Sequence, residues 1–571
     1  MATVADRIVQ SLVQAGARRI YGVVGDSLNS IVDAIRRTPE MQWVAVRHEE
    51  AAAYAAGAEA QTTGRLGACA GSCGPGNLHL INGLYDCNRS YAPVLAIAAH
   101  IPSGEIGTSY FQETHPDRLF VDCSQFCEMI SNARQVPRTL RLAIQSALQR
   151  RGVSVLTIPG DVALEQAVGP WNPTELVHPQ PEVRPTDASL DQLVALLEGA
   201  ERITLLCGSG CAGAHAEVVA LADRLGAPVV HALRGKEHVE FDNPFDVGMT
   251  GLVGFASGYR AMESCDLLLM LGTDFPYDGF YPSKSKVVQI DLRGENLGRR
   301  TRLDLGLVGD IRSTLEALLP RLKRRDRAFL ETCQSDYKST RHALDSRVKE
   351  LSRQDGIHPQ YVAATLSELA KDDAIVTADT GMSTVWAARY LRMKRGRRLL
   401  GSFNHGSMAN ALPQAIGAQC ANPDRQVISF SGDGGLGMLM GELLTLVQHD
   451  LPVKVVVFNN STLGMVKLEM QVAGLPNFGT DFKHFDFARI AEGAGIRSFR
   501  VDHGTELASA VSEALSHPGP ALVDVNTTPY ELSMPPKVDL TQAWGFSLFT
   551  LKEVVLGHSK DLIQQLKDNV D

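Results

Sequence analysis

Short apolar runs alternate with amphipathic stretches along most of the 571-residue chain. The amphipathic stretches repeat with helical periodicity, and the apolar runs have the length of buried strands. These runs are RLGACAGSCG, VSVLTIPG, RITLLCGSG, DLLLMLGTD, KVVQIDL, AIVTADTG, QVISFSGDGG and VKVVVFNN. Such strands alternating with helices are typical of parallel sheets covered on both faces. The pattern predicts an α/β fold made of doubly wound parallel-sheet domains.

Two polar stretches divide this alternation, and the chain is too long for one hydrophobic core. The first stretch is rich in proline, VGPWNPTELVHPQPEVRPTD at 168–187, and the second is highly charged and spans 321–359. Stretches of this composition commonly link domains. We predict three domains, at 1–180, 186–334 and 335–530.

The C-terminal segment 531–571 has no strand pattern. In a helix its apolar residues fall near one stripe, which predicts an amphipathic tail that lies on a phospholipid surface or packs against the protein. From residue 544 onward three lysines stand against four acids, so anionic lipid would add little attraction. The stripe consists of Trp544, Leu548, Leu551, Val555, Leu562 and Leu566.

Composition narrows the classes of function. A net charge of −9 offers no basic excess to neutralise phosphates, so nucleic acid is not an expected partner. The N-terminus predicts a helix followed by a strand, not a secretory peptide, and no apolar run reaches the roughly 18 residues of a membrane span. The spacings of the ten cysteines differ from those of zinc knuckles, so we expect reduced thiols and a cytoplasmic protein.

The stretch SGDGGLG, residues 431–437, places one aspartate among four glycines at the end of a predicted strand. A glycine-rich turn between strand and helix lets backbone N–H groups approach a phosphate. An aspartate there repels phosphate unless a divalent cation bridges the two. Asp433, flanked by Gly434 and Gly435, therefore predicts a metal site, most simply for Mg²⁺.

A second oxygen ligand is expected at the end of the neighbouring strand, where VKVVVFNNSTLG places Asn460, 27 residues after Asp433. The alternative to a metal site is a tight turn followed by two adjacent asparagines that occur there by chance. The pattern resembles the diphosphate-binding signature of thiamine diphosphate enzymes. This resemblance implies that Asp433, Asn460 and the backbone carbonyl of Thr462 hold Mg²⁺, and that Leu463, Gly464 and Met465 lie against the cofactor.

The first domain resembles the pyrimidine-binding half of the same family across VRHEEAAAYAAGAEAQTTGRLGACAGSCGPGNLHLINGLYDC. There a glutamate in an Arg-His-Glu context ends a strand, and Glu49 matches it. A carboxyl group bonded to a pyrimidine nitrogen stabilises the imino tautomer that removes the thiazolium proton. Glu49 would thus activate the cofactor, whereas Glu50 is more simply a polar residue at a helix start.

The segment GSMANALPQAIGAQ, 406–419, resembles another cofactor contact of the family. An apolar side chain there bends the cofactor, and Met408 matches it, preceded by Gly406 and Ser407. Without this resemblance, a methionine at the start of a helix is most simply interpreted as a residue that packs in the hydrophobic core.

The middle domain carries Gly208, Gly210 and Gly213 in G-x-G-x-x-G spacing after a strand. The next strand ends in His231 and Arg234 instead of the acid that NAD requires, which disfavours NAD. The segment resembles the FAD-binding domain of flavin-containing thiamine diphosphate enzymes, although related decarboxylases keep this domain without flavin. The positions matched to FAD are Thr250, Gly251, Leu252, Val253, Thr273, Asp274, Phe275, Pro276, Tyr277 and Asp291.

Over nearly the whole chain the sequence is similar to the quinone-dependent pyruvate oxidases, through EIGTSYFQETHP, GSFNHGSMANALPQAIGAQ and the ending GFSLFTLK among others. The resemblance implies oxidative decarboxylation of pyruvate to acetate and CO₂, with electrons passed through FAD to a membrane quinone (ubiquinone). It also implies a homotetramer, in which each cofactor lies between the first domain of one subunit and the third of another, peripherally bound to the cytoplasmic face of the inner membrane.

The same resemblance implies residues at the substrate. Phe111 and Gln112 match an apolar wall and a carbonyl-binding amide, and Glu469 matches a proton-shuttling glutamate, although a surface carboxylate is the simpler interpretation of Glu469. Met465 stands where this subgroup carries an aromatic next to the reacting carbon. Any role of that aromatic in gating or electron transfer is therefore in doubt here.

Three alternatives share much of this machinery. One is an acetolactate-synthase-like carboligase with structural FAD, and another is an oxygen-dependent pyruvate oxidase that forms acetyl phosphate. The third is a membrane-associated binding protein with a degenerate cofactor site, against which the intact Glu49, Asp433 and Asn460 argue.

Overall fold

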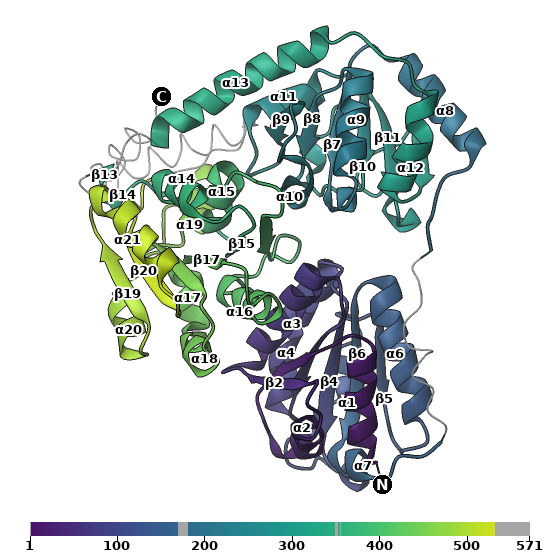
Figure 1. Ribbon diagram of the computed structural model, residues 1–571, viewed down its shortest axis with the longest axis vertical. Coiled ribbons are helices and arrows are strands. Elements are labelled where there is room, and N and C mark those ends of the chain that lie inside the picture. The colour runs from purple at the N-terminus through teal and green to yellow at the C-terminus, as the bar shows by residue number, and fades with distance from the viewer. Residues whose placement is uncertain (1, 170–180, 349–351, 354–355, 532–571) are drawn as a thin grey trace.

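The computed structural model describes residues 2–169, 181–348, 352–353 and 356–531. It contains three parallel sheets of six strands each, one after another along the chain, with helices on both faces (Figure 1). This confirms the predicted α/β class, and each of the eight apolar runs contains a strand. The predicted tail lies outside the described residues apart from Glu531. Among the described residues, no helix combines the length and apolarity needed to cross a bilayer.

The first sheet has the order β2-β1-β3-β4-β6-β5. Its strands are β1 Arg19–Gly22, β2 Gln42–Ala45, β3 Gly67–Gly71, β4 Val94–His100, β5 Phe126–Met129 and β6 Val153–Pro159. Helices covering it are α1 Val4–Gln14, α2 Asn29–Arg36, α3 Glu49–Thr63, α4 Pro75–Arg89, α5 Pro116–Leu119, α6 Val136–Arg150 and α7 Gly160–Leu164. The alanines of α3 are fully buried, so this helix lies inside the molecule and not on its surface.

The second sheet has the order β12-β11-β10-β7-β8-β9, which is the order of a Rossmann fold. Its strands are β7 Ile203–Cys207, β8 Val229–His231, β9 Asp246–Met249, β10 Leu267–Leu271, β11 Lys286–Asp291 and β12 Leu305–Val308. Its helices are α8 Asp187–Glu198, α9 His215–Leu225, α10 Lys236–Val239, α11 Ala256–Glu263 and α12 Ile311–Leu318. Helix α13, Ala328–Val348, then leads to the third domain and occupies much of the charged stretch at 321–359.

The third sheet has the order β16-β15-β17-β18-β20-β19, which repeats the topology of the first sheet strand for strand. Its strands are β15 Ile375–Ala378, β16 Arg398–Gly401, β17 Val427–Gly432, β18 Lys454–Asn459, β19 Arg497–Val501 and β20 Ala521–Asn526, and a small hairpin of β13 Ser352–Arg353 and β14 Gly356–Ile357 precedes it. Its helices are α14 Pro359–Leu369, α15 Met382–Tyr390, α16 Ala411–Ala421, α17 Asp433–Met438, α18 Leu443–Gln448, α19 Gly464–Val472, α20 Phe487–Gly493 and α21 Gly504–Ser516.

Helices α3 and α16 join the first and third domains (Figure 1). Each follows the second strand of its own sheet, so the two helices are topological equivalents that pack against each other. Gly417 makes this possible, because a Cβ there would lie 2.6 Å from the main-chain Cα and C atoms of Ala55. Close backbone contact and a shared core of small residues therefore hold the two domains together.

Candidate cofactor-binding site

Asp433 lies where β17 ends and α17 begins, and its carboxylate is directed toward the neighbouring loop. Its Oδ1 accepts a hydrogen bond from the Gly434 N–H at 2.8 Å, and its Oδ2 accepts one from the Ser461 N–H at 2.5 Å. The side chain is largely buried, and this burial raises its pKa to about 6. A buried carboxylate of this kind is stabilised in its ionised form by a bound cation.

The loop after β18 supplies the other oxygen atoms. The Asn460 side-chain oxygen accepts a hydrogen bond from the Thr462 N–H at 3.2 Å, and the intervening Ser461 adopts a left-handed conformation with φ of 56°. Ser461 is also the residue that bonds Asp433, so the aspartate and this loop are linked directly. Carboxylate, amide and carbonyl oxygens in adjoining loops suit Mg²⁺.

An aspartate that we did not single out from the sequence lies beside this turn. Asp379 directly follows β15 and is buried, and burial raises its pKa to about 7. Its Oδ1 accepts a hydrogen bond from the Ala411 N–H at 3.2 Å, and a Cβ at Gly435 would lie 2.8 Å from its Cγ. The last glycine of Gly-Asp-Gly-Gly, Gly435, is thus required by this carboxyl group. The signal in the sequence was an acid at the end of the strand AIVTADTG.

Met408 reaches the same turn from the segment between β16 and α16. A Cβ at Gly434 would lie 3.3 Å from Met408 Cε, 2.9 Å from Leu463 Cδ2 and 3.3 Å from Phe482 Cε2. Three apolar side chains therefore converge over the turn that carries Asp433. Phe482 was not among the residues predicted from the sequence.

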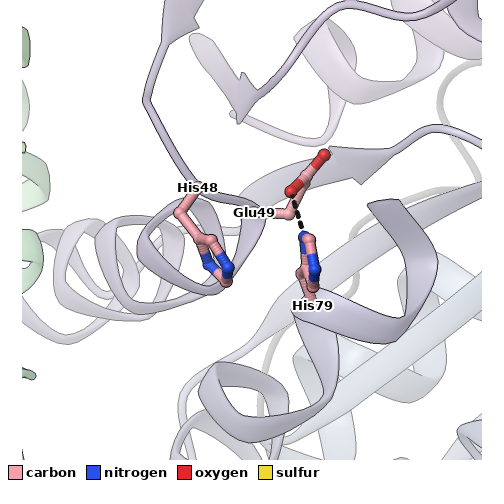
Figure 2. A group of neighbouring side chains, drawn as sticks. All are labelled: His48, Glu49 and His79. Carbon is pink, nitrogen blue, oxygen red and sulfur yellow. Dashed lines mark hydrogen bonds and ion pairs between the residues drawn. The ribbon is translucent and has the colours of Figure 1, made fainter. Parts of the chain in front are cut away.

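Glu49 begins helix α3 in the first domain, and only 8% of its surface is exposed. Figure 2 shows its carboxylate directed at the ring of His79, with Oε2 2.9 Å from Nδ1. Oε1 lies 3.0 Å from the position of a Cβ at Gly76, in the first turn of α4. The ring of His48 stacks on that of His79 with 4.2 Å between centroids.

His48, Glu49 and His79 could also be considered as a metal site, because one ligand atom from each lies within 4.8 Å of the others. However, His48 Nδ1 accepts a hydrogen bond from the Glu50 N–H at 3.2 Å, which places the proton of a neutral ring on Nε2. Burial lowers the pKa of His48, which favours this neutral form. The remaining nitrogen is then a donor, and the trio is a hydrogen-bonded group and not a cation site.

Asn82 connects the Glu49 end of the site with the Met408 end. Its side-chain nitrogen donates to Ser407 Oγ at 2.9 Å and to Glu50 Oε1 at 2.8 Å, and its oxygen lies 2.8 Å from His405 Nε2. Glu50 therefore holds Asn82, the residue that contacts the third domain, beyond the simple helix-start role expected for it. Nearby, Glu442 of the third domain accepts hydrogen bonds from the N–H groups of residues 47 and 48 at 2.9 and 3.0 Å.

The residues matched to substrate contacts differ in how far they are exposed to solvent. Gln112 has a left-handed backbone with φ of 62° and packs against Gly74 in the turn before α4, with its side-chain oxygen 3.4 Å from Cys73 Sγ. Phe111 is 78% exposed. Met465, in the first turn of α19, is partly buried against the core of the third domain, and Glu469 is exposed on the same helix.

The middle domain brings together the segments matched to FAD. Gly210 donates its N–H to the Gly272 carbonyl at 2.9 Å, which closes the loops after β7 and β10 on each other at the switch point of the sheet. The glycine motif therefore serves contact between two loops. A Cβ at Gly251 would lie 3.0 Å from the Phe275 ring, so the segments at 250–253 and 273–277 are in contact.

Two polar groups in this region bear on ligand binding. Thr250 is buried, and its hydroxyl has no hydrogen-bond partner within the described chain. Asp291 ends β11, and burial raises its pKa, although its Oδ1 accepts hydrogen bonds from the Arg293 N–H at 2.8 Å and from Asn296 at 3.2 Å. An unpartnered buried hydroxyl and a strand-end carboxyl at the same edge of one parallel sheet suit a ligand with its own hydrogen-bonding groups.

The fold and these contacts define an α/β protein whose first and third domains pack together, with the buried carboxylate of Glu49 at the start of α3 and that of Asp433 at the end of β17. Family models agree with each domain, namely the thiamine pyrophosphate enzyme N-terminal TPP binding domain at 2–119, the central domain at 190–318 and the C-terminal TPP binding domain at 379–525. The chain belongs to the thiamine pyrophosphate (thiamine diphosphate) enzyme family.

Individual relatives span almost the full length. YdaP of Bacillus subtilis (strain 168) is 36% identical over 552 residues, covering 96% of both chains. Pyruvate oxidase of Lactiplantibacillus plantarum is 30% identical over 91% of this chain and 88% of its own. Chloroplastic acetolactate synthase 1 of Zea mays is 31% identical over 91% of this chain and 85% of its own.

Proposed function

We propose that the protein oxidatively decarboxylates pyruvate with thiamine diphosphate, Mg²⁺ and FAD, and passes the electrons to a membrane quinone such as ubiquinone. The balanced reaction is pyruvate, water and quinone giving acetate, CO₂ and quinol. The proposed enzyme is a homotetramer bound peripherally to the cytoplasmic face of the inner membrane through its C-terminal tail. The relationship to a pyruvate oxidase over 91% of the chain supports pyruvate as the substrate.

The observation that carries the proposal is the link made by Asn82, which bonds Glu50, next to Glu49, and also Ser407. Ser407 is followed by Met408, whose Cε lies 3.3 Å from the position of a Cβ at Gly434 in the Asp433 turn. When bound, thiamine diphosphate supplies the electron sink for loss of the carboxylate, and FAD supplies the acceptor for the two electrons. Asp433, Asn460 and Thr462 would hold Mg²⁺ on the diphosphate. Glu49 would bond a pyrimidine nitrogen, and Met408 would support the bend between the two rings.

Features of the middle domain favour FAD over NAD as its ligand. Its strand order is that of a nucleotide-binding fold, its Thr250 hydroxyl is buried without a partner in the described chain, and His231 ends β8 where NAD would need an acid. Gln112 beside Cys73 would place an amide near the Glu49 end of the site, where it could bond a substrate carbonyl.

A carboligase that condenses two pyruvate molecules to acetolactate is the second candidate. Its support is the equal similarity to acetolactate synthases, which reaches 31% identity over 91% of the chain. An oxygen-dependent pyruvate oxidase that forms acetyl phosphate is the third. All three share Glu49 and Asp433, so the test must follow the electrons and the product.

The deciding experiment is anaerobic absorbance of the purified protein with Mg²⁺ and thiamine diphosphate, before and after pyruvate is added. Bleaching of a flavin band, followed by quinone-dependent re-oxidation with formation of acetate, is the expected result. A persistent band with accumulation of acetolactate would establish the carboligase. Acetyl phosphate formed with oxygen and phosphate, without a response to quinone or lipid vesicles, would establish the oxygen-dependent oxidase. Absence of a flavin band would contradict the FAD assignment.

A further inference from the structure

His79 lies outside the sequence-based prediction, yet it is the side chain that bonds Glu49. It projects from the second turn of α4, and its Nδ1 is 2.9 Å from Glu49 Oε2. No other hydrogen bond to the Glu49 carboxylate is found within the described chain. The position of this carboxylate therefore depends on one partner.

The ring of His79 is itself fixed in orientation. It stacks on His48 with an interplanar angle of 24°, and His48 is held by the hydrogen bond from the Glu50 N–H to its Nδ1. This bond occupies His48 Nδ1, and within the described chain no hydrogen bond joins the other His48 nitrogen to Glu49, so the carboxylate is bonded by His79. The stack fixes the ring plane, and the hydrogen bond to Glu49 fixes the tautomer of His79 with its proton on Nδ1.

The two carboxylate oxygens of Glu49 thus have different surroundings. Oε2 accepts from His79, while Oε1 faces the first turn of α4 at Gly76, where a side chain would fill the space beside it. A carboxylate that bonds one pyrimidine nitrogen needs one oxygen held back and the other free.

We propose that His79 is a positioning residue that holds Glu49 Oε2 so that Oε1 is presented to the pyrimidine ring of thiamine diphosphate. The inference rests on the proposed cofactor of this site but not on the substrate, FAD or quinone. His79 acts through Glu49 and touches no reacting atom. The side chain of His79 is 43% exposed, so it also joins the buried carboxylate to solvent.

Two substitutions separate the hydrogen bond from the stack. His79→Phe keeps a ring against His48 but removes the donor, whereas His79→Asn keeps a donor near the position of Nδ1 but removes the ring. His503→Phe is the matched control, because His503 is exposed and makes no side-chain cap bond to its helix. Thermal midpoints of the full-length variants without cofactor verify that each one folds.

The measurements are the Kd of thiamine diphosphate with Mg²⁺ by calorimetry, and the rate at which the thiazolium C2 proton of bound cofactor exchanges with deuterium. Neither measurement requires pyruvate. We expect His79→Phe to slow exchange at saturating cofactor by about ten- to a hundredfold, the effect of losing a hydrogen bond to a charged group. The exchange rate of His79→Asn should stay within about threefold of the natural protein, because this variant keeps a hydrogen-bond donor. His503→Phe should not change the exchange rate.

A double-mutant cycle tests whether His79 acts through Glu49. In the Glu49→Gln background, the further change His79→Phe should slow exchange by much less than it does alone. Unchanged exchange in His79→Phe, equal loss in His79→Phe and His79→Asn, or additive losses in the cycle would each overturn the inference. Failure of the natural protein to bind thiamine diphosphate would overturn both this inference and the proposed function. If the variants show the expected exchange rates but the natural protein does not oxidise pyruvate, only the proposed function is contradicted.

Discussion

The contact between α3 and α16 can be tested with a single methyl group. Gly417→Ala places a Cβ 2.6 Å from the Cα and C atoms of Ala55, and an ordinary contact begins near 3.4 Å. Because the Ala55 carbonyl oxygen lies closer still, the two helices must separate by at least about 0.8 Å, the difference of these distances. Main-chain atoms cannot rotate aside, so we place the cost near the upper end of core overpacking, about 3 kcal/mol. The better helix propensity of alanine returns about 1 kcal/mol, which leaves a net destabilisation of about 2 kcal/mol.

Gly493→Ala is the matched control, because Gly493 also lies in a helix but has no atom near its Cβ position. This change should stabilise the protein by about 0.5 kcal/mol. In a thermal scan we expect the midpoint of Gly417→Ala to fall by about 4 to 8 °C and that of Gly493→Ala to rise slightly. Equal midpoints for the two variants would refute the close packing of α3 on α16.

Three further predictions concern buried charges. Asp433→Asn should weaken Mg²⁺-dependent binding of thiamine diphosphate by about tenfold or more in calorimetry, and unchanged affinity would contradict a metal role. Burial raises the pKa of Asp86 to about 6, above the unfolded value near 3.9. Its protonated form therefore stabilises the fold below about pH 3.9, and this stabilisation of about 3 kcal/mol is lost as pH rises through 6. In urea unfolding, the free energy of unfolding of Asp86→Asn should fall less between pH 4 and 7 than that of the natural protein. Arg500→Met leaves the fully buried carboxylate of Asp524 without its 2.7 Å ion pair. This change should lower the free energy of unfolding in urea by about 3 kcal/mol, and the further change Asp524→Asn should restore part of that loss. Additive losses from the two changes would argue against the ion pair.

The sequence was most informative about the sheets, because their strands are buried on both faces and therefore appear as continuous apolar runs. VISFSG and KVVVFN, for example, form β17 and β18 as expected, side by side and parallel. The charged stretch at 321–359 was harder to interpret, since α13 presents a polar surface over most of its length. Its single helix spans the predicted boundary at 334/335, which stays a prediction.

The sequence indicated a candidate site residue where one short motif contains both the ionisable side chain and the turn around it, as with Asp433 among glycines. His79 and Asn82 could not be found in this way, because they bond residues 30 and 325 positions away, respectively. Asp379 carries an acid at a strand end, but only the contact with Gly435 shows why it is there. Long-range partners of this kind are set by the packing of α3, α4 and α16, which periodicity does not reveal.

The shared strand order of the first and third domains has an evolutionary meaning. Two domains with the same topology, joined through equivalent helices, form the arrangement that duplication and divergence of one ancestral unit produce. After such an event each copy is free to lose what the other retains. Here the earlier copy keeps an acid after its second strand, and the later copy keeps one after its third. A nearly symmetric pair of domains with acids at different positions would bind an asymmetric ligand in a single orientation.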